Sequence, residues 1–128
     1  MTAEFLGSSP LRVELREDGL WVLLYPLVFR SVKFGRIFHA PMGFVTDFAS
    51  VPRIPFVYEL AGNRIFKAAV IHDKALEDMP RGDAALLFLE AMEAEGIPEY
   101  LRRGAYAAVR LHDQSYREGP NVVLPQGD

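Results

Sequence analysis

The residues best suited to chemistry are two neighbours, His72 and Asp73. An imidazole can act as a general base, and a carboxylate can bind a hard cation such as calcium. Adjacent residues of a helix point about a third of a turn apart, so these side chains cannot pair but can serve one site in different roles. Asp83 follows Pro80-Arg81-Gly82, which interrupts the helical spacing of apolar residues after His72. If the flanking segments form an antiparallel hairpin of helices, we expect Asp83 to orient the imidazole of His72, as a carboxylate supports a general base.

The second candidate is a long segment rich in proline and glycine, from Pro41 to Pro55. Long loops inside compact domains are more often functional than idle. We expect it to meet the helix through Thr46 and Asp47, with Asp47 as a third catalytic candidate beside His72 and Asp83. The residues assigned to a binding or structural loop are Gly43, Thr46, Asp47, Ser50 and Arg53.

A structural interpretation of the same residues stays open and is the one that the sequence favours. His72 can be a core histidine bonded to a loop carbonyl, and Asp83 can be a helix N-cap. Asp47 can bond the amides of Ala49 or Ser50 within its own loop, as aspartate commonly does in turns. The site would then be a buried polar lock between the loop and the helix.

Further along the chain, His112 and Asp113 repeat the His-Asp pair. With His39 they could form the metal set of an HD phosphohydrolase, but that fold is all helical and this chain begins with strands. Arg110 belongs to a basic helix face that we expect to be solvated.

The elements that must position these residues are strands first. Alternation of apolar and polar residues over Leu11–Leu15 predicts a half-buried strand, and Asp18-Gly19 is a strong turn signal after it. Leu20–Tyr25 is apolar on both faces and predicts a central strand. Two further short strands are predicted over Val28–Val32 and Arg36–His39.

Three helices follow. The first is predicted over Arg64–Leu76, with His72 on its apolar face. The second begins at Gly82 or Asp83 and runs through Glu95, where Gly96 supplies the stop. The third runs from Pro98 to about Leu111. The predicted fold class is therefore α+β, with an N-terminal antiparallel β-sheet followed by a three-helix C-terminal half.

Composition limits the function classes. The 128 residues are enough for one domain, which we place at residues 11–117, between a flexible N-terminus (1–10) and an extended C-terminal tail (118–128). The lack of cysteine excludes disulfides, thiolate metal sites and cysteine nucleophiles. A net charge of -3 gives no general phosphate-binding surface, so no nucleic-acid partner is expected. No apolar run is long enough for a transmembrane segment, and the N-terminus lacks the pattern of a secretory signal.

Two strings of residues resemble the signature of a known family. GFVTDFASVPR at Gly43–Arg53 is followed by AAVIHD at Ala68–Asp73, and Ala107–Arg110 completes the order. They resemble the phage-associated uncharacterised family catalogued as domain of unknown function one-three-five-three, over roughly Leu11 to Leu111. Members usually follow the His-Asp pair with aromatic residues, whereas this chain has Lys74-Ala75-Leu76.

The resemblance implies a small accessory protein encoded by a phage or prophage, because family members lie in tailed-phage genomes, often near tail or lysis genes. The function expected is that of a virion or tail-associated structural or assembly component acting by binding. Its partners would be phage structural proteins or a second copy of itself. It would be located in the virion, or in the host cytoplasm during assembly.

The alternative is a small hydrolase that acts on envelope material when the phage enters or lyses its host. The motif arrangement is similar to the phospholipase A2 core, in which calcium lies between the aspartate of a His-Asp pair and a glycine-rich loop. By that analogy His72 activates water, Asp73 binds calcium and Asp83 orients His72, while Gly43–Asp47 supplies further oxygen ligands. The hypotheses differ in whether Asp47, His72 and Asp73 line a solvent-reachable cleft or use their polar atoms internally.

Overall fold

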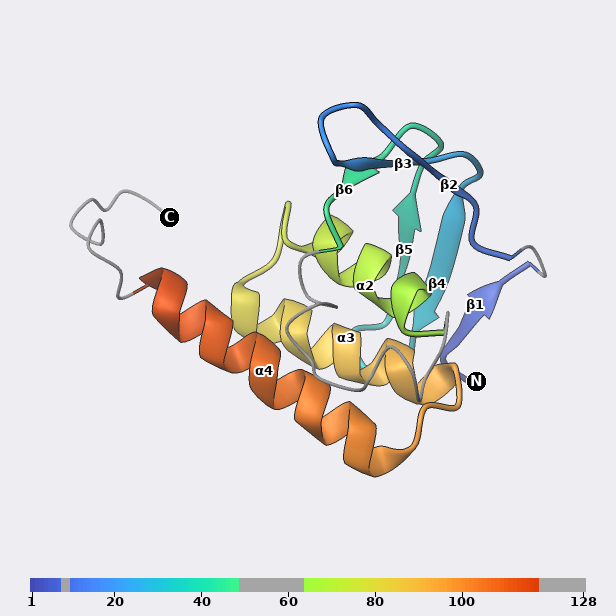
Figure 1. Ribbon diagram of the computed structural model, residues 1–128. Coiled ribbons are helices and arrows are strands. Elements are labelled where there is room, and N and C mark those ends of the chain that lie inside the picture. The colour runs from blue at the N-terminus through green and yellow to red at the C-terminus, as the bar shows by residue number, and fades with distance from the viewer. Residues whose placement is uncertain (8–9, 49–63, 118–128) are drawn as a thin grey trace.

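The computed structural model describes residues 1–7, 10–48 and 64–117 of the chain (Figure 1). Strands occupy the N-terminal half and helices the C-terminal half, so the predicted α+β fold is confirmed. Two of the predicted loop residues, Ser50 and Arg53, lie outside the described residues, as does the predicted tail at 118–128.

The first sheet has the strand order β1-β4-β5, and both of its pairings are antiparallel. It consists of β1 (Glu4–Leu6), β4 (Leu27–Ser31) and β5 (Arg36–Ala40). We expected residues 1–10 to be flexible, but β1 pairs along β4, and the rings of Phe5 and Phe29 lie 4.8 Å apart. Glu4–Leu6 shows no alternation of apolar and polar residues, so the sequence did not indicate a strand there, and the pairing with β4 determines it.

The second sheet has the order β2-β3-β6, with β2 at Val13–Leu15, β3 at Trp21–Leu23 and β6 at Val45–Thr46. The strand predicted within Leu20–Tyr25 is central, as expected. β6 was missed, because it lies within the segment that we predicted to be a loop. Its two residues pair with β3, which places the start of the Thr46-Asp47 motif on the edge of a sheet.

The three predicted helices are α2 (Arg64–Ala75), α3 (Arg81–Ala94) and α4 (Glu99–Arg117). None of the helices within the described ranges is long and apolar enough to cross a membrane. α4 continues six residues beyond the predicted end at Leu111. The extension matters, because it brings His112 and Asp113 onto the helix. The helix was predicted from the spacing of apolar residues. Beyond Leu111 the buried position is taken by the charged Asp113, so that spacing did not indicate that the helix continues.

The helices cover one face of the first sheet. α2 packs on β4 and β5, α3 packs on α2, β1 and β4, and α4 lies against α3 on the side away from the strands (Figure 1). A hydrophobic core fills the space between these layers. Its largest fully buried side chains include Phe29, Phe88, Ile65, Ile71 and Leu87. Close packing of this kind holds α2 and its His72 in one fixed orientation.

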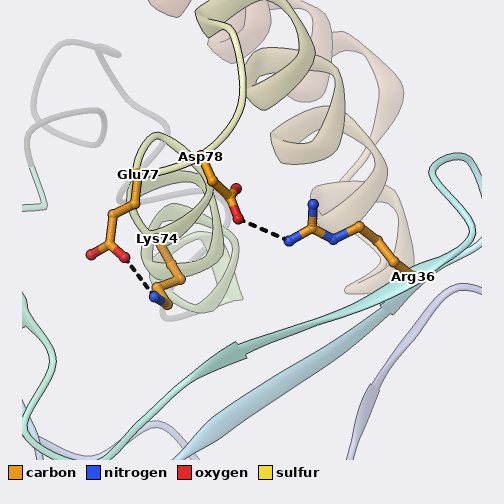
Figure 2. A network of polar contacts seen from close by, with 4 residues as sticks. All are labelled: Arg36, Lys74, Glu77 and Asp78. Atoms are coloured by element: carbon orange, nitrogen blue, oxygen red, sulfur yellow. Dashed lines mark hydrogen bonds and ion pairs between the residues drawn. The ribbon is translucent and has the colours of Figure 1, made fainter.

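Ion pairs flank the C-terminal end of α2 (Figure 2). Arg36 of β5 lies 3.2 Å from Asp78, and Lys74 lies 2.6 Å from Glu77. Both pairs reach solvent, so each contributes at most about 1 kcal/mol to stability. Their consequence for the site is electrostatic: the ammonium of Lys74, next to Asp73 in the chain, is paired with Glu77.

Candidate functional site

A pocket of about 200 Å³ lies where the end of β6 meets the three helices. Its lining includes both motifs that the sequence singled out, the Thr46-Asp47 segment and the His72-Asp73 pair. It also includes residues of α3 and α4. The lining residues are Thr46, Asp47, Phe48, Ala69, His72, Asp73, Leu76, Arg81, Val109 and His112. The structure therefore brings the Thr46-Asp47 segment and α2 together at one pocket.

The strand side of the pocket is held by an unusual backbone position. Phe48 has a φ of 52°, in the left-handed region that non-glycine residues rarely adopt. Its amide donates to the Thr46 hydroxyl at 3.2 Å, and its ring packs edge-on against Phe66 at 4.9 Å and near Trp21 at 5.9 Å. These contacts fix the turn that leaves Asp47 exposed at the rim while Thr46 is buried.

His72 is the buried polar residue of the pocket, with 6% of its surface exposed. Its ring lies 5.2 Å from that of Phe88. Among the described residues, its Nε2 atom has no hydrogen-bond partner. Burial lowers the pKa of His72 to about 4; the charges of Arg81 and His112 act in the same direction, and that of Asp113 opposes them. The imidazole is therefore neutral at pH 7.

Asp73 lies one residue further on, half-buried in the pocket wall. Burial raises the pKa of this carboxyl, and the nearby charges of Asp47 and Glu77 raise it further. A side-chain hydrogen bond with Thr46 acts in the opposite direction. The two motifs thus interact directly: Thr46 bonds Asp73, and the negative charges of Asp47 and Asp73 repel each other.

A buried cluster of charges, missed by the sequence analysis, lies beside His72. Asp113 is 1% exposed, and its two carboxylate oxygens accept from Arg81 at 3.3 Å and from Arg110 at 3.0 Å. The expectation that Arg110 is simply solvated is wrong. One usable signal is that Arg110 and Asp113 are three residues apart and so lie on the same face of α4. Arg81 could not be found in this way, because only the packing of α4 on α3 brings it to Asp113.

The family model described as "Protein of unknown function (DUF1353)" matches residues 21–109. The chain belongs to this family. The matched DUF1353 segment contains every pocket residue except His112, so the pocket is built almost entirely from the part of the chain that the family shares. Comparison with curated proteins and with solved structures found no match.

Asp83, His39 and Gly43, which the sequence analysis considered, are not among the described residues that line the DUF1353 pocket. Asp83 lies in the first turn of α3, where a carboxylate interacts favourably with the helix dipole. It is not the N-cap, because that position is Pro80, and the acidic residue whose charge acts on His72 is Asp113. His39 is exposed on β5. Gly43 has a φ of 92° and donates its amide to Leu23 at 2.8 Å, so it forms the turn before β6.

No group of three or more His, Asp or Glu residues in the described parts of the chain is arranged to hold a metal ion. The calcium role considered for Asp73 thus stays a prediction, supported only by the proximity of its charge to that of Asp47.

Proposed function

We propose that this DUF1353 chain is an accessory protein of a phage or prophage, associated with the virion or tail, and that it binds a partner through the pocket lined by His72 and Asp73. It would act in the virion, or in the host cytoplasm during assembly. The phage association rests on the family resemblance, and one observation carries the binding role. His72 is buried in the pocket wall, yet its Nε2 has no partner among the described residues. A buried polar atom left in this state costs about 1–3 kcal/mol. A partner whose binding rearranges the pocket so that Nε2 gains a hydrogen bond gives a physical reason for a histidine at this position.

Two properties of His72 favour binding over hydrolysis. Its pKa of about 4 makes it neutral at pH 7, but a general base is most effective when its pKa lies near the working pH. The Nε2 atom is also buried, so bulk water has no direct access to it. A neutral imidazole in this environment is a good hydrogen-bond acceptor and a weak base.

The alternative function is the His-Asp hydrolase, assisted by calcium and acting on envelope material. The observation that favours it is the convergence of Asp47, His72 and Asp73 on one pocket. In that case His72 would activate water and the two carboxylates would share the cation, while Asp113 would take the electrostatic role expected of Asp83. Calcium-dependent hydrolysis of phospholipid vesicles, lost in both His72→Gln and Asp73→Asn, would replace the binding proposal with this one.

The binding function is tested by co-sedimentation of the purified full chain with particles of the phage that encodes it. We expect the wild-type chain to sediment with the particles and His72→Gln to lose at least about tenfold in affinity, as at a buried hot spot. His39→Gln is the matched control, because this histidine is exposed on β5. Thermal unfolding of each variant verifies that it is folded.

Failure of the wild-type chain to sediment contradicts the virion role. Equal binding by wild type and by folded His72→Gln contradicts the assignment of the pocket as the binding site.

A further inference from the structure

Phe48 has a backbone conformation that its residue type disfavours. Its φ of 52° is the only positive value at a non-glycine position in the described parts of the chain. In this left-handed region the Cβ atom lies too close to the following carbonyl oxygen, so a bulky residue is strained there. Such strain persists only where the surrounding structure enforces it, and it is concentrated at active sites, ligand clamps and switch regions. Phe48 lines the pocket, so the strain lies at the candidate site.

Contacts on two sides of Phe48 enforce the strained turn. Its amide donates to the Thr46 hydroxyl at 3.2 Å, and that hydroxyl also bonds the Asp73 side chain of α2. Its ring is 7% exposed and packs near the rings of Phe66 and Trp21. Burial of a phenylalanine ring stabilises by about as much as a left-handed backbone costs. The turn is therefore held closed by a small margin.

The rest of the described lining is held more firmly. Most of it belongs to the three helices, which pack on one another, and Thr46 belongs to β6. The lining residues outside helices and strands are Asp47, Phe48 and Leu76. The Leu76 amide continues the hydrogen bonding of α2, since it donates to the His72 carbonyl at 3.2 Å. A partner that rearranges the pocket, as the binding function requires, therefore meets least resistance at Asp47-Phe48.

We propose that Asp47-Phe48 is the part of the pocket that moves when the partner binds. The inference rests on the binding function above and assigns the moving element of the same site. In the free chain the strained turn is closed. In the complex Phe48 leaves the left-handed region, its ring withdraws from the lining and the partner takes its place. The release of strain contributes to the affinity, because the partner then favours one of two backbone states.

The strain is measured with two variants that both lack the ring. Phe48→Gly tolerates a positive φ, whereas Phe48→Ala keeps the Cβ atom that causes the strain. Urea denaturation at pH 7 should give Phe48→Gly a folding equilibrium constant about fivefold larger than that of Phe48→Ala. An alanine variant that is as stable as the glycine variant would overturn the inference.

Met42→Gly and Met42→Ala are the matched control pair. Met42 is exposed in a turn, and its φ is not positive. At such a position alanine restricts the unfolded chain without straining the folded one. We expect Met42→Ala to be at least as stable as Met42→Gly, and a preference for glycine at both positions would mean that Phe48 carries no special strain.

Partner binding distinguishes a turn that moves from one that is only strained. If position 48 relaxes in the complex, Phe48→Ala releases its strain on binding and Phe48→Gly has none to release. We therefore expect Phe48→Gly to bind the phage particles about fivefold more weakly than Phe48→Ala in the co-sedimentation assay, although it is the more stable protein. Equal binding by the two variants, or tighter binding by Phe48→Gly, overturns the inference.

A turn that is closed by a small margin should also open in the free chain. We expect the Phe48 amide, corrected for its intrinsic rate, to exchange hydrogen at least about tenfold faster than the Leu23 amide, which donates to the Phe44 carbonyl at 2.9 Å. Thr46→Val removes the acceptor and should speed the exchange further, whereas Thr46→Ser keeps a hydroxyl and should not. Exchange at Phe48 as slow as at Leu23, or an equal rise in both Thr46 variants, contradicts the proposed opening.

The outcomes separate this inference from the binding function. If co-sedimentation depends on His72 but the two Phe48 variants bind equally, the binding function stands and the moving turn is wrong. If the wild-type chain does not sediment with particles, the binding function fails and this inference fails with it, whatever the stabilities of the two variants.

Discussion

Two polar side chains on neighbouring helices, the part-buried Glu90 and the buried His72, differ in how their hydrogen bonds are used. Glu90 of α3 accepts three hydrogen bonds from the β4–β5 turn, from Ser31 Oγ at 2.6 Å, the Val32 amide at 2.9 Å and the Lys33 amide at 3.0 Å. Ser31 in turn accepts the Phe34 amide at 2.9 Å. His72 of α2 is more deeply buried, yet among the described residues its Nε2 has no partner.

The contrast distinguishes a group with a structural role from one to which we assign a function. Buried polar groups in proteins are nearly always hydrogen-bonded, so a satisfied carboxylate such as Glu90 is explained by the turn that it holds. A buried nitrogen without a partner among the described residues calls for another explanation, and sites of binding, catalysis or strain are where such atoms occur. The following predictions test this difference, from the largest expected effect to the smallest.

Acid should affect the His72 site most. Its pKa in the folded chain, about 4, lies below the ordinary value of 6.5. A depressed pKa contributes stability above pH 6.5 that is lost as the pH falls through the folded value. About 2.5 pKa units correspond to roughly 3 kcal/mol at 1.36 kcal/mol per unit. Urea denaturation at pH 7 and pH 4 should therefore show a loss in wild type that exceeds the loss in His72→Phe by about that amount. An identical loss in both proteins would mean that His72 is not the group protonated.

Removal of Glu90 should destabilise the fold by about 2–3 kcal/mol, because three hydrogen bonds of about 0.5–1.5 kcal/mol each are lost. The change is Glu90→Ala, measured by urea denaturation at pH 7. Glu93→Ala on the same helix is the control, since Glu93 is exposed and should change stability by no more than about 0.5 kcal/mol. Similar values for both variants would show that the contacts with the turn contribute nothing specific.

Replacement of His72 by phenylalanine should have the opposite sign at pH 7. We expect the free energy of unfolding to rise by about 1 kcal/mol, because an unpartnered polar atom is exchanged for an apolar ring beside Phe88. The same variant should lose ligand binding, so stability and function would change in opposite directions. A loss of stability at pH 7 would instead indicate that Nε2 is satisfied in the folded chain.

Asp73→Asn should give the smallest effect, a gain of a few tenths of a kcal/mol at pH 7, because solvent screens this half-buried group. Its pKa is raised, so its contribution to stability is present at low pH and is lost as the pH rises through the folded value. The advantage of the asparagine should therefore disappear as the pH approaches 3.8, the ordinary value for aspartate. Asp78→Asn breaks an exposed ion pair and should not show this pH dependence.

Local patterns in the sequence determined most of the elements that carry the site. Apolar spacing predicted the helix around His72 and placed the histidine on its buried side, as the structure has it. The run Leu20–Tyr25, apolar on both faces and preceded by the Asp18-Gly19 turn, predicted the central strand that pairs with Thr46. The strands β1 and β6 were missed, because Glu4–Leu6 does not alternate and Val45–Thr46 is too short to show a period, so both become strands only beside a partner.

The electrostatics of the pocket were decided by the tertiary structure. Asp113 meets Arg81 across 32 positions of the chain, and no local spacing encodes such a pair. Asp83 had the expected residue type near the expected turn, yet the packing of α4 on α3 brings the charge of Asp113 to bear on His72 instead. The sequence alone therefore determined which side chains could do chemistry. Packing determined which of them are buried together, and burial is what keeps His72 neutral at pH 7 and makes the charge of Asp73 unfavourable.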